Sequence, residues 1–167
     1  MDLNKELGTD LGKLSKSVVA KGGVLANFYF DLHAKNKDSL QQLGAALVQK
    51  ILQEQDVVYA VGEIDEPMEN GDMFSTTVDV TVLVKKLFPL SRICGNYSPF
   101  SIEIVEPKEI RIPISEAHEL LMNVATTNYE LKKFIMEKVY KEKELAELNK
   151  VVLGRMELGR KLMEKKR

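Results

Sequence analysis

VLANFYFDLHA, residues 24–34, alternates apolar and polar side chains, and so does MFSTTVDVTVLVK, residues 73–85. Such alternation is typical of strands that bury one face. Two further strand-like runs lie at residues 57–67 and 100–107, and stretches of helical periodicity give the order strand, helix, strand, strand, helix, strand. This βαββαβ order predicts an α+β fold with a ferredoxin-like core, in which four antiparallel strands carry two helices on one face.

Helical segments are expected on both sides of this core. Leucines recur at helical spacing near the N-terminus, at Leu3, Leu7, Leu11 and Leu14. We therefore divide the chain into an amphipathic N-terminal helix (residues 1–21), the ferredoxin-like core (residues 22–107) and a long C-terminal helical extension with a basic tail (residues 108–167).

The extension carries an apolar seam whose members follow alternating four- and three-residue steps. They are Ala117, Leu121, Val124, Asn128, Leu131 and Ile135. This heptad-like spacing requires a surface to bury it, either the nominally open face of the sheet or a second chain. Because the open face is polar, we favour self-association through these helices, and so a homo-oligomer. Asn128 would suit a register-setting position in that pairing.

The polar face of the sheet provides the candidate ligand-binding residues. If the Val- and Phe-rich faces lie under the helices, the other face collects side chains of the types that hold divalent cations or show perturbed pKa values. They are Asp31, His33, Asp79 and Glu103. We expect the first and third strands to be an adjacent, parallel central pair, with Asp31 near Asp79. These four are candidates only, and no firm metal site or cofactor is assigned.

Composition argues against several classes of partner. The net charge of −1 gives no strong field toward nucleic acid or membrane, and no apolar run is long enough to span a bilayer. The N-terminus carries acidic residues and lacks the apolar segment of a secretory signal. Cys94 is the single cysteine, so no internal disulfide can form and a reducing cytoplasm is the expected location.

Two features bear on nucleic acid. Residues 155–167 contain six Lys or Arg against two Glu, which is typical of a solvated helix end and, less often, of an arm that contacts phosphate. The sheet offers carboxylates rather than exposed aromatic residues on both central strands, so we do not expect RNA binding there. Phosphate-binding and nucleophile-elbow motifs are missing from the sequence, and no catalytic residue is assigned.

Four segments carry a resemblance to a known family: KGGVLANFYFDLHAK (21–35), YAVGEIDEP (59–67), FSTTVDVTVLVK (74–85) and NYSPFSIEIVEP (96–107). They resemble a family of conserved, uncharacterised archaeal proteins over roughly residues 21–125. The element order is also similar to ACT-like regulatory domains, which pair their sheets in dimers and bind small ligands at the interface. Those domains typically place glycine after the first strand, whereas this chain has residues 34–38, AKNKD, there.

Three hypotheses follow. The first is a non-catalytic oligomeric module for protein interaction or regulation, with an unknown protein partner possible beside the homo-oligomer. The second is a metal-dependent or small-ligand-binding protein that uses the acidic sheet face. The third is weak nucleic-acid association through the basic tail.

Overall fold

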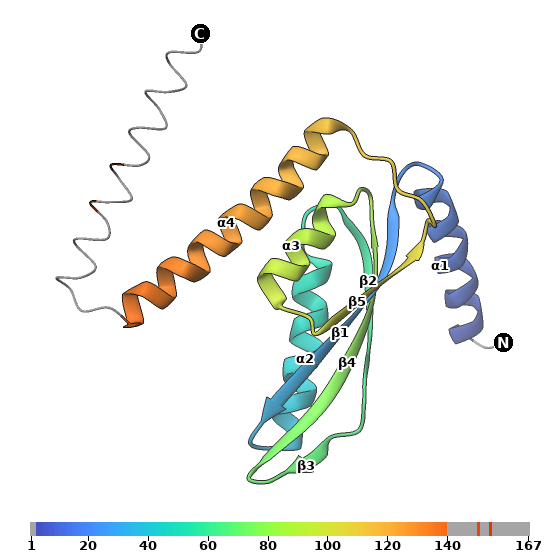
Figure 1. Ribbon diagram of the computed structural model, residues 1–167. Coiled ribbons are helices and arrows are strands. Elements are labelled where there is room, and N and C mark those ends of the chain that lie inside the picture. The colour runs from blue at the N-terminus through green and yellow to red at the C-terminus, as the bar shows by residue number, and fades with distance from the viewer. Residues whose placement is uncertain (1–2, 140–149, 151–153, 155–167) are drawn as a thin grey trace. The chain divides into compact units, whose positions relative to one another are not determined.

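The computed structural model describes residues 3–139, 150 and 154 (Figure 1). The helices are α1 (Leu3–Val19), α2 (Lys37–Leu52), α3 (Phe88–Tyr97) and α4 (Ile114–Val139). The strands are β1 (Val24–Ala34), β2 (Val57–Ile64), β3 (Met68–Asn70), β4 (Met73–Val84) and β5 (Ser101–Glu106). The expected α+β class is therefore confirmed. None of the described helices combines the length and apolar character needed to cross a bilayer.

The strands form one antiparallel sheet in the order β2-β4-β1-β5, and β3 pairs with the free end of β4. The sheet has five strands rather than the four expected. β4 is twelve residues long, so its second half pairs with β2 and its first residues pair with β3. Pro67 lies between β2 and β3. Because proline has no backbone N–H, it cannot donate a ladder hydrogen bond, and it stands here where the pairing with β4 passes from one strand to the other.

The expectation that the first and third long strands run parallel was wrong. β1 and β4 are neighbours but antiparallel, with Phe28 opposite Val80. The chain order explains the direction, because the α2 crossover returns β2 parallel to β1 and the following hairpin reverses the chain into β4. That hairpin turns at Gly71 with a φ of 62°, a conformation that favours glycine.

The core lies between one face of the sheet and helices α2 and α3 (Figure 1). Alternate residues of β1 and β4 point into it, and the fully buried members include Val24, Phe28, Val80 and Val84. α2 approaches β2 closely because Gly62 has no side chain: a Cβ there would collide with Val48. The predicted separation of the two sheet faces is confirmed for β1 and β4, whereas Ile102 and Ile104 of β5 stay 41% and 46% exposed.

The N-terminal helix α1 lies on the opposite side of the sheet from α2 and α3 (Figure 1). The Ser15 Oγ and Tyr59 hydroxyl oxygens are 2.9 Å apart and share a hydrogen bond. Leu83, which points away from the α2 layer, is nevertheless fully buried. Helix α1 therefore covers one end of the face that the sequence suggested would be open.

The chain divides into two compact units, residues 1–124 and residues 125–167. Helix α4 begins in the first unit and ends in the second. In the first unit it follows β5 through a linker whose Ile110 packs against the core. Residues 155–167, the basic tail, lie outside the described residues, so the expectation about that tail stays a prediction.

Candidate functional site

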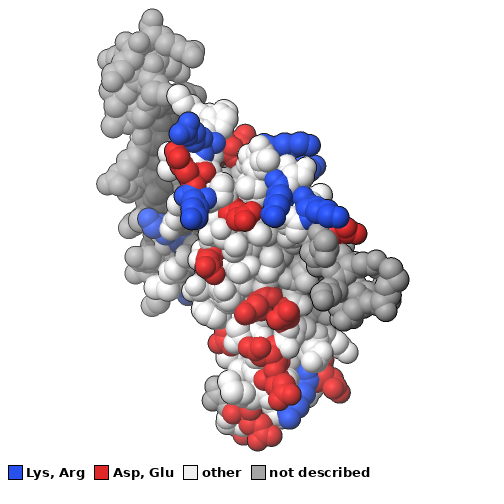
Figure 2. Space-filling model, turned by 90° about the vertical axis from the view of Figure 1, so that its right-hand side faces the viewer, with Lys and Arg blue, Asp and Glu red and all other residues white. Residues whose placement is uncertain are grey.

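The four candidate metal ligands lie on the face of the sheet away from α2 and α3. β1 contributes Asp31 and His33, β4 contributes Asp79, and β5 contributes Glu103. Figure 2 views the molecule from this side and shows acidic side chains gathered over the lower half of the view. Helix α1 covers one end of this face, and the remainder is exposed and acidic.

Of these four candidates, the structure brings Asp31 and His33 into contact. His33 Nε2 lies 3.1 Å from Asp31 Oδ2. The Tyr29 hydroxyl donates a long hydrogen bond of 3.5 Å to Glu103 Oε2. Asp79 is opposite Tyr29 in the ladder, two residues from the pairing position of Asp31. Among the described residues, no three His, Cys, Asp or Glu side chains gather closely enough to hold a metal ion.

Asp79 stands in an unfavourable electrostatic position. Glu63 of β2 lies directly opposite it, and like charges at such cross-strand positions repel. Partial burial raises the pKa of the Asp79 carboxyl, and the negative charges of Asp65 and Glu63 raise it further. A proton, a cation or a basic partner group at this place would relieve the repulsion.

A small hollow lies beside this like-charge pair. Its volume is about 240 Å³, and it is lined by Asn27, Tyr29, Val61, Glu63, Asp79 and Thr81. Thr81 Oγ1 donates a 2.9 Å hydrogen bond to Asn27 Oδ1, which fixes two of the polar groups. The lining combines carboxylates with neutral oxygen atoms, a set suited to a small cationic or polar ligand.

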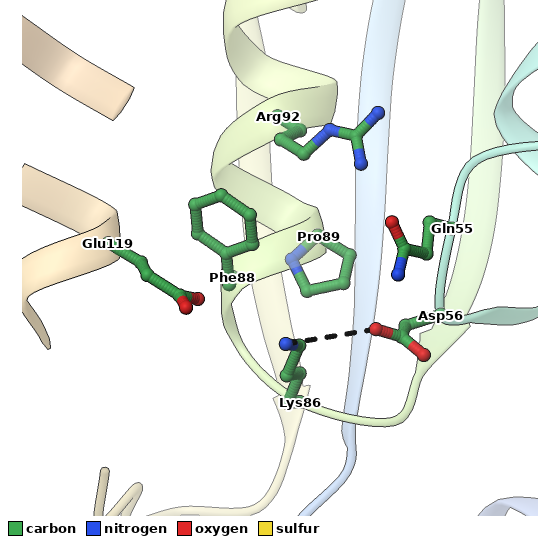
Figure 3. Close-up of a pocket in the computed structure, with 7 residues that line it drawn as sticks. All are labelled: Gln55, Asp56, Lys86, Phe88, Pro89, Arg92 and Glu119. Carbon is green, nitrogen blue, oxygen red and sulfur yellow. Dashed lines mark ion pairs between the residues drawn. The ribbon is translucent and has the colours of Figure 1, made fainter. Parts of the chain in front are cut away.

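A second hollow lies at the start of α3, with a volume of about 340 Å³ (Figure 3). Its lining residues are Gln55, Asp56, Lys86, Phe88, Pro89, Arg92 and Glu119. The cations here are compensated: Lys86 Nζ lies 3.8 Å from Asp56 Oδ2, and Arg92 pairs with Glu54 at 2.6 Å. No sequence motif predicted this hollow, because its residues come from three distant segments.

Glu54 is the hub of the polar contacts behind that hollow. Its side chain is only 10% exposed, and it accepts hydrogen bonds from the Tyr97 hydroxyl at 2.9 Å and from Asn96 Nδ2 at 3.2 Å. Burial, followed by the hydrogen bond to Glu54, raises the pKa of Tyr97. These contacts tie the turn after α2 to α3, so their first effect is structural.

Cys94 lies on α3, between Arg92 and Asn96 in the sequence. It is half-buried and packs against the core. Burial raises the pKa of its thiol, with a smaller opposing effect from a backbone hydrogen bond. The thiolate is the nucleophilic form, so this environment suits a packing residue better than a reactive one.

The seam on α4 is an exposed apolar feature of the described surface. Helix α4 has no fully buried residue along its 26 positions. The side chain of Leu121 is 71% exposed and that of Leu131 is 56% exposed. Val124 and Ile135 are also exposed by about half, Asn128 is exposed, and Ala117 is partly buried.

The first turns of α4 contact α3 through polar groups. The Phe88 backbone N–H donates a 3.0 Å hydrogen bond to Glu116 Oε1, and Asn123 Nδ2 donates a 3.3 Å hydrogen bond to Ser91 Oγ. At 3.6 residues per turn, Glu116 and Asn123 lie about two-fifths of a turn away from Leu121. Within the first unit, α4 thus contacts α3 through polar groups while Leu121 of the seam stays exposed.

Comparison with known proteins places the chain in a family. No curated protein and no solved structure matches it. A family model does match, over residues 25–160, which is most of the chain. This agrees with the resemblance to an uncharacterised archaeal family that the core segments suggested. The chain belongs to the MJ0538 family.

Proposed function

We propose that this protein is a non-catalytic module that self-associates through the seam of helix α4 and serves protein interaction or regulation. The observation that carries the proposal is that α4 contacts α3 through polar side chains while an apolar side chain on another face of the helix stays exposed. Glu116 and Asn123 anchor the helix to α3, while Leu121 stays 71% exposed. A contiguous apolar stripe of this kind on a folded protein commonly marks an interaction surface.

The topology supports an interaction role only weakly. The order β2-β4-β1-β5 with two helices on one face fits the ferredoxin-like arrangement, to which the three-residue strand β3 would be an addition. Many unrelated functions use that arrangement, so it does not by itself indicate a function, and the exposed surface of α4 is the more specific feature. We also propose a reducing cytoplasm as the location, since Cys94 is the single, half-buried cysteine.

The experiment is a comparison of solution mass between two double variants. Leu121→Gln with Leu131→Gln removes two seam side chains and should dissociate the assembly. Thr126→Gln with Glu130→Gln changes two exposed residues on the opposite side of the same helix and should leave the assembly intact. Equal masses for the two variants would contradict the proposal.

A second candidate function is binding of a divalent cation or a small polar ligand on the acidic sheet face. The observation in its favour is the direct cross-strand opposition of Glu63 and Asp79, an arrangement that a bound cation would stabilise. A divalent ion should then raise Tm, and the rise should be lost in Asp79→Asn. Asp31→Asn tests the separate pair with His33 in the same way. No Tm change with any divalent ion would end this candidate.

The third possibility, nucleic-acid association, depends on the basic tail. Deletion of residues 155–167 should abolish any such binding, and unchanged binding would refute it. The acidic half of the sheet face in Figure 2 would repel phosphate, so the sheet itself is a poor surface for nucleic acid.

A further inference from the structure

The two edges of the sheet differ in how well they are protected. β5 and β2 are the edge strands, and each has one row of backbone groups that no described strand pairs. Such a row is a template for another strand, and proteins usually block it with charges, proline, bulges or shortness.

β5 carries several of these protections. It is six residues long and includes Glu103 and Glu106. Its pairing with β1 shifts between Leu25 and Ala26, leaving Val105 as an extra residue in a bulge. Pro107 follows directly. Ile102, Ile104 and Val105 are 41%, 46% and 42% exposed, but the two carboxylates, the bulge and the proline make this edge the poorer template for another strand.

β2 has few of these protections against strand addition. It is eight residues long, contains no proline, and has Glu63 as its only charged residue. Its ladder irregularity lies at its start, between Val57 and Tyr59, which leaves the remainder regular. Val61, near the middle, has a side chain that is 46% exposed. An apolar β-branched residue at the centre of an unpaired edge favours strand addition.

We propose that β2 is a second interface, at which it pairs antiparallel with β2 of another copy of this chain about Val61. In this register Val61 meets its own equivalent, Tyr59 lies opposite Glu63 of the partner subunit, and Ala60 lies opposite the partner's Gly62. No like charges face each other. A register centred on Glu63 would oppose two carboxylates, which is destabilising.

The position of α2 allows this pairing. A Cβ at Gly44 would lie 2.6 Å from Ile64 Cδ1 and 3.4 Å from Val78 Cγ2, so α2 crosses above the space between β2 and β4 rather than beyond the edge. With strands about 4.8 Å apart, two α2 helices would lie about 10 Å from each other. That is a normal distance between packed helices, and the exposed Ala45 and Leu52 on this flank would meet there.

This inference rests on the proposed function only in that both concern self-association, because the β2 edge involves no residue of α4. The two interfaces can therefore fail separately. A chain with both would assemble beyond a dimer, while a chain with the edge alone would form a dimer that seam substitutions do not affect.

The first test is disulfide cross-linking in the full chain with Cys94→Ala. Directly opposed residues of antiparallel strands have a Cα separation that a disulfide can span. Val61→Cys should give a covalent dimer on mild oxidation, and the matched variant Ser101→Cys, on the exposed β5 edge, should not. Failure of the Val61 variant to cross-link, or equal cross-linking of both, would overturn the inference.

The second test uses Val61→Lys, which places a charge at the centre of the edge without disturbing the core. The assembly mass should fall by half, and an unchanged mass would overturn the inference. Repeating the Val61→Cys cross-link with Leu121→Gln and Leu131→Gln separates the two proposals. A retained cross-link shows that the edge acts independently of the seam. A cross-link abolished by these distant changes would contradict that independence.

Discussion

The backbone N–H of Phe88, the first residue of α3, donates a 3.0 Å hydrogen bond to Glu116 Oε1 in the first turn of α4. The first amides of a helix have no partner within that helix. The residue before Phe88 is Leu87, and it provides no side-chain cap. A carboxylate from α4 thus caps α3, and this contact helps to fix which face of α4 points outward.

Loss of this cap should be measurable. Glu116→Ala is expected to lower the free energy of unfolding by about 1 kcal/mol, the usual cost of a lost N-cap. Glu116→Gln keeps an acceptor oxygen and should retain most of the stability. Thermal denaturation of both variants checks the result, and equal Tm values for Glu116→Ala and the unmodified chain would show that the contact contributes nothing.

Two glycines near the N-terminus should respond in opposite directions to alanine. A Cβ at Gly23 would meet the Val84 carbonyl oxygen at 2.6 Å, so Gly23→Ala should destabilise by about 1–3 kcal/mol. A Cβ at Gly12, within α1, has no heavy atom within 4 Å, so Gly12→Ala should stabilise by up to about 1 kcal/mol. Chemical denaturation distinguishes them, and changes of the same sign would contradict the packing of α1 on the sheet.

Much of the sheet was predictable because β1 and β4 alternate so regularly. A period of two leaves one assignment of faces that buries Phe28 and Val80 and exposes Asp31 and Asp79. The extra strand β3 was not predictable, since its three residues carry too short a pattern to separate from a hairpin loop. The cover provided by α1 was also missed, because Leu83 gives no sign in the sequence of being buried from both sides.

The candidate sites were less predictable than the fold. Faces could be read from alternation, but which acid lies opposite which depends on register, so the Glu63–Asp79 opposition appeared only in three dimensions. The hub at Glu54 joins residues about forty positions apart and has no motif. The set of residues that share the α4 seam followed from spacing alone, because a heptad-like pattern identifies one helix face directly, but spacing did not predict that this face is exposed.

Contacts to Glu54 should contribute to stability. Glu54→Ala removes the acceptor for Tyr97 and the ion-pair partner of Arg92, and should cost about 1–3 kcal/mol. Tyr97→Phe removes a single hydrogen bond and should cost about 1 kcal/mol. The double variant should cost less than the two single changes together, and strict additivity in urea denaturation would contradict direct coupling.

The pH dependence of stability should report the raised pKa of Asp79. A carboxyl whose pKa is higher in the folded than in the unfolded state stabilises the fold when protonated, and that contribution is lost as pH rises through the folded value. Asp79→Asn should therefore raise Tm at neutral pH by no more than a few degrees. The advantage should disappear as pH falls toward the ordinary carboxyl range, about 4.

A matched control makes this pH test specific. Glu69→Gln removes an acid from the exposed strand β3, away from the Glu63–Asp79 opposition. Its Tm difference from the unmodified chain should not follow the Asp79→Asn profile. Parallel pH profiles for the two variants would mean that overall charge, rather than the local repulsion, governs the effect.

The central claim is that the α4 seam joins chains, and the solution mass of the full chain by light scattering over a concentration series tests it most directly. The account predicts a mass that is a multiple of one chain for the unmodified protein, with a lower mass for Leu121→Gln combined with Leu131→Gln. A single-chain mass for the unmodified protein at every concentration would contradict it, and so would a double variant that assembles as well as the unmodified chain.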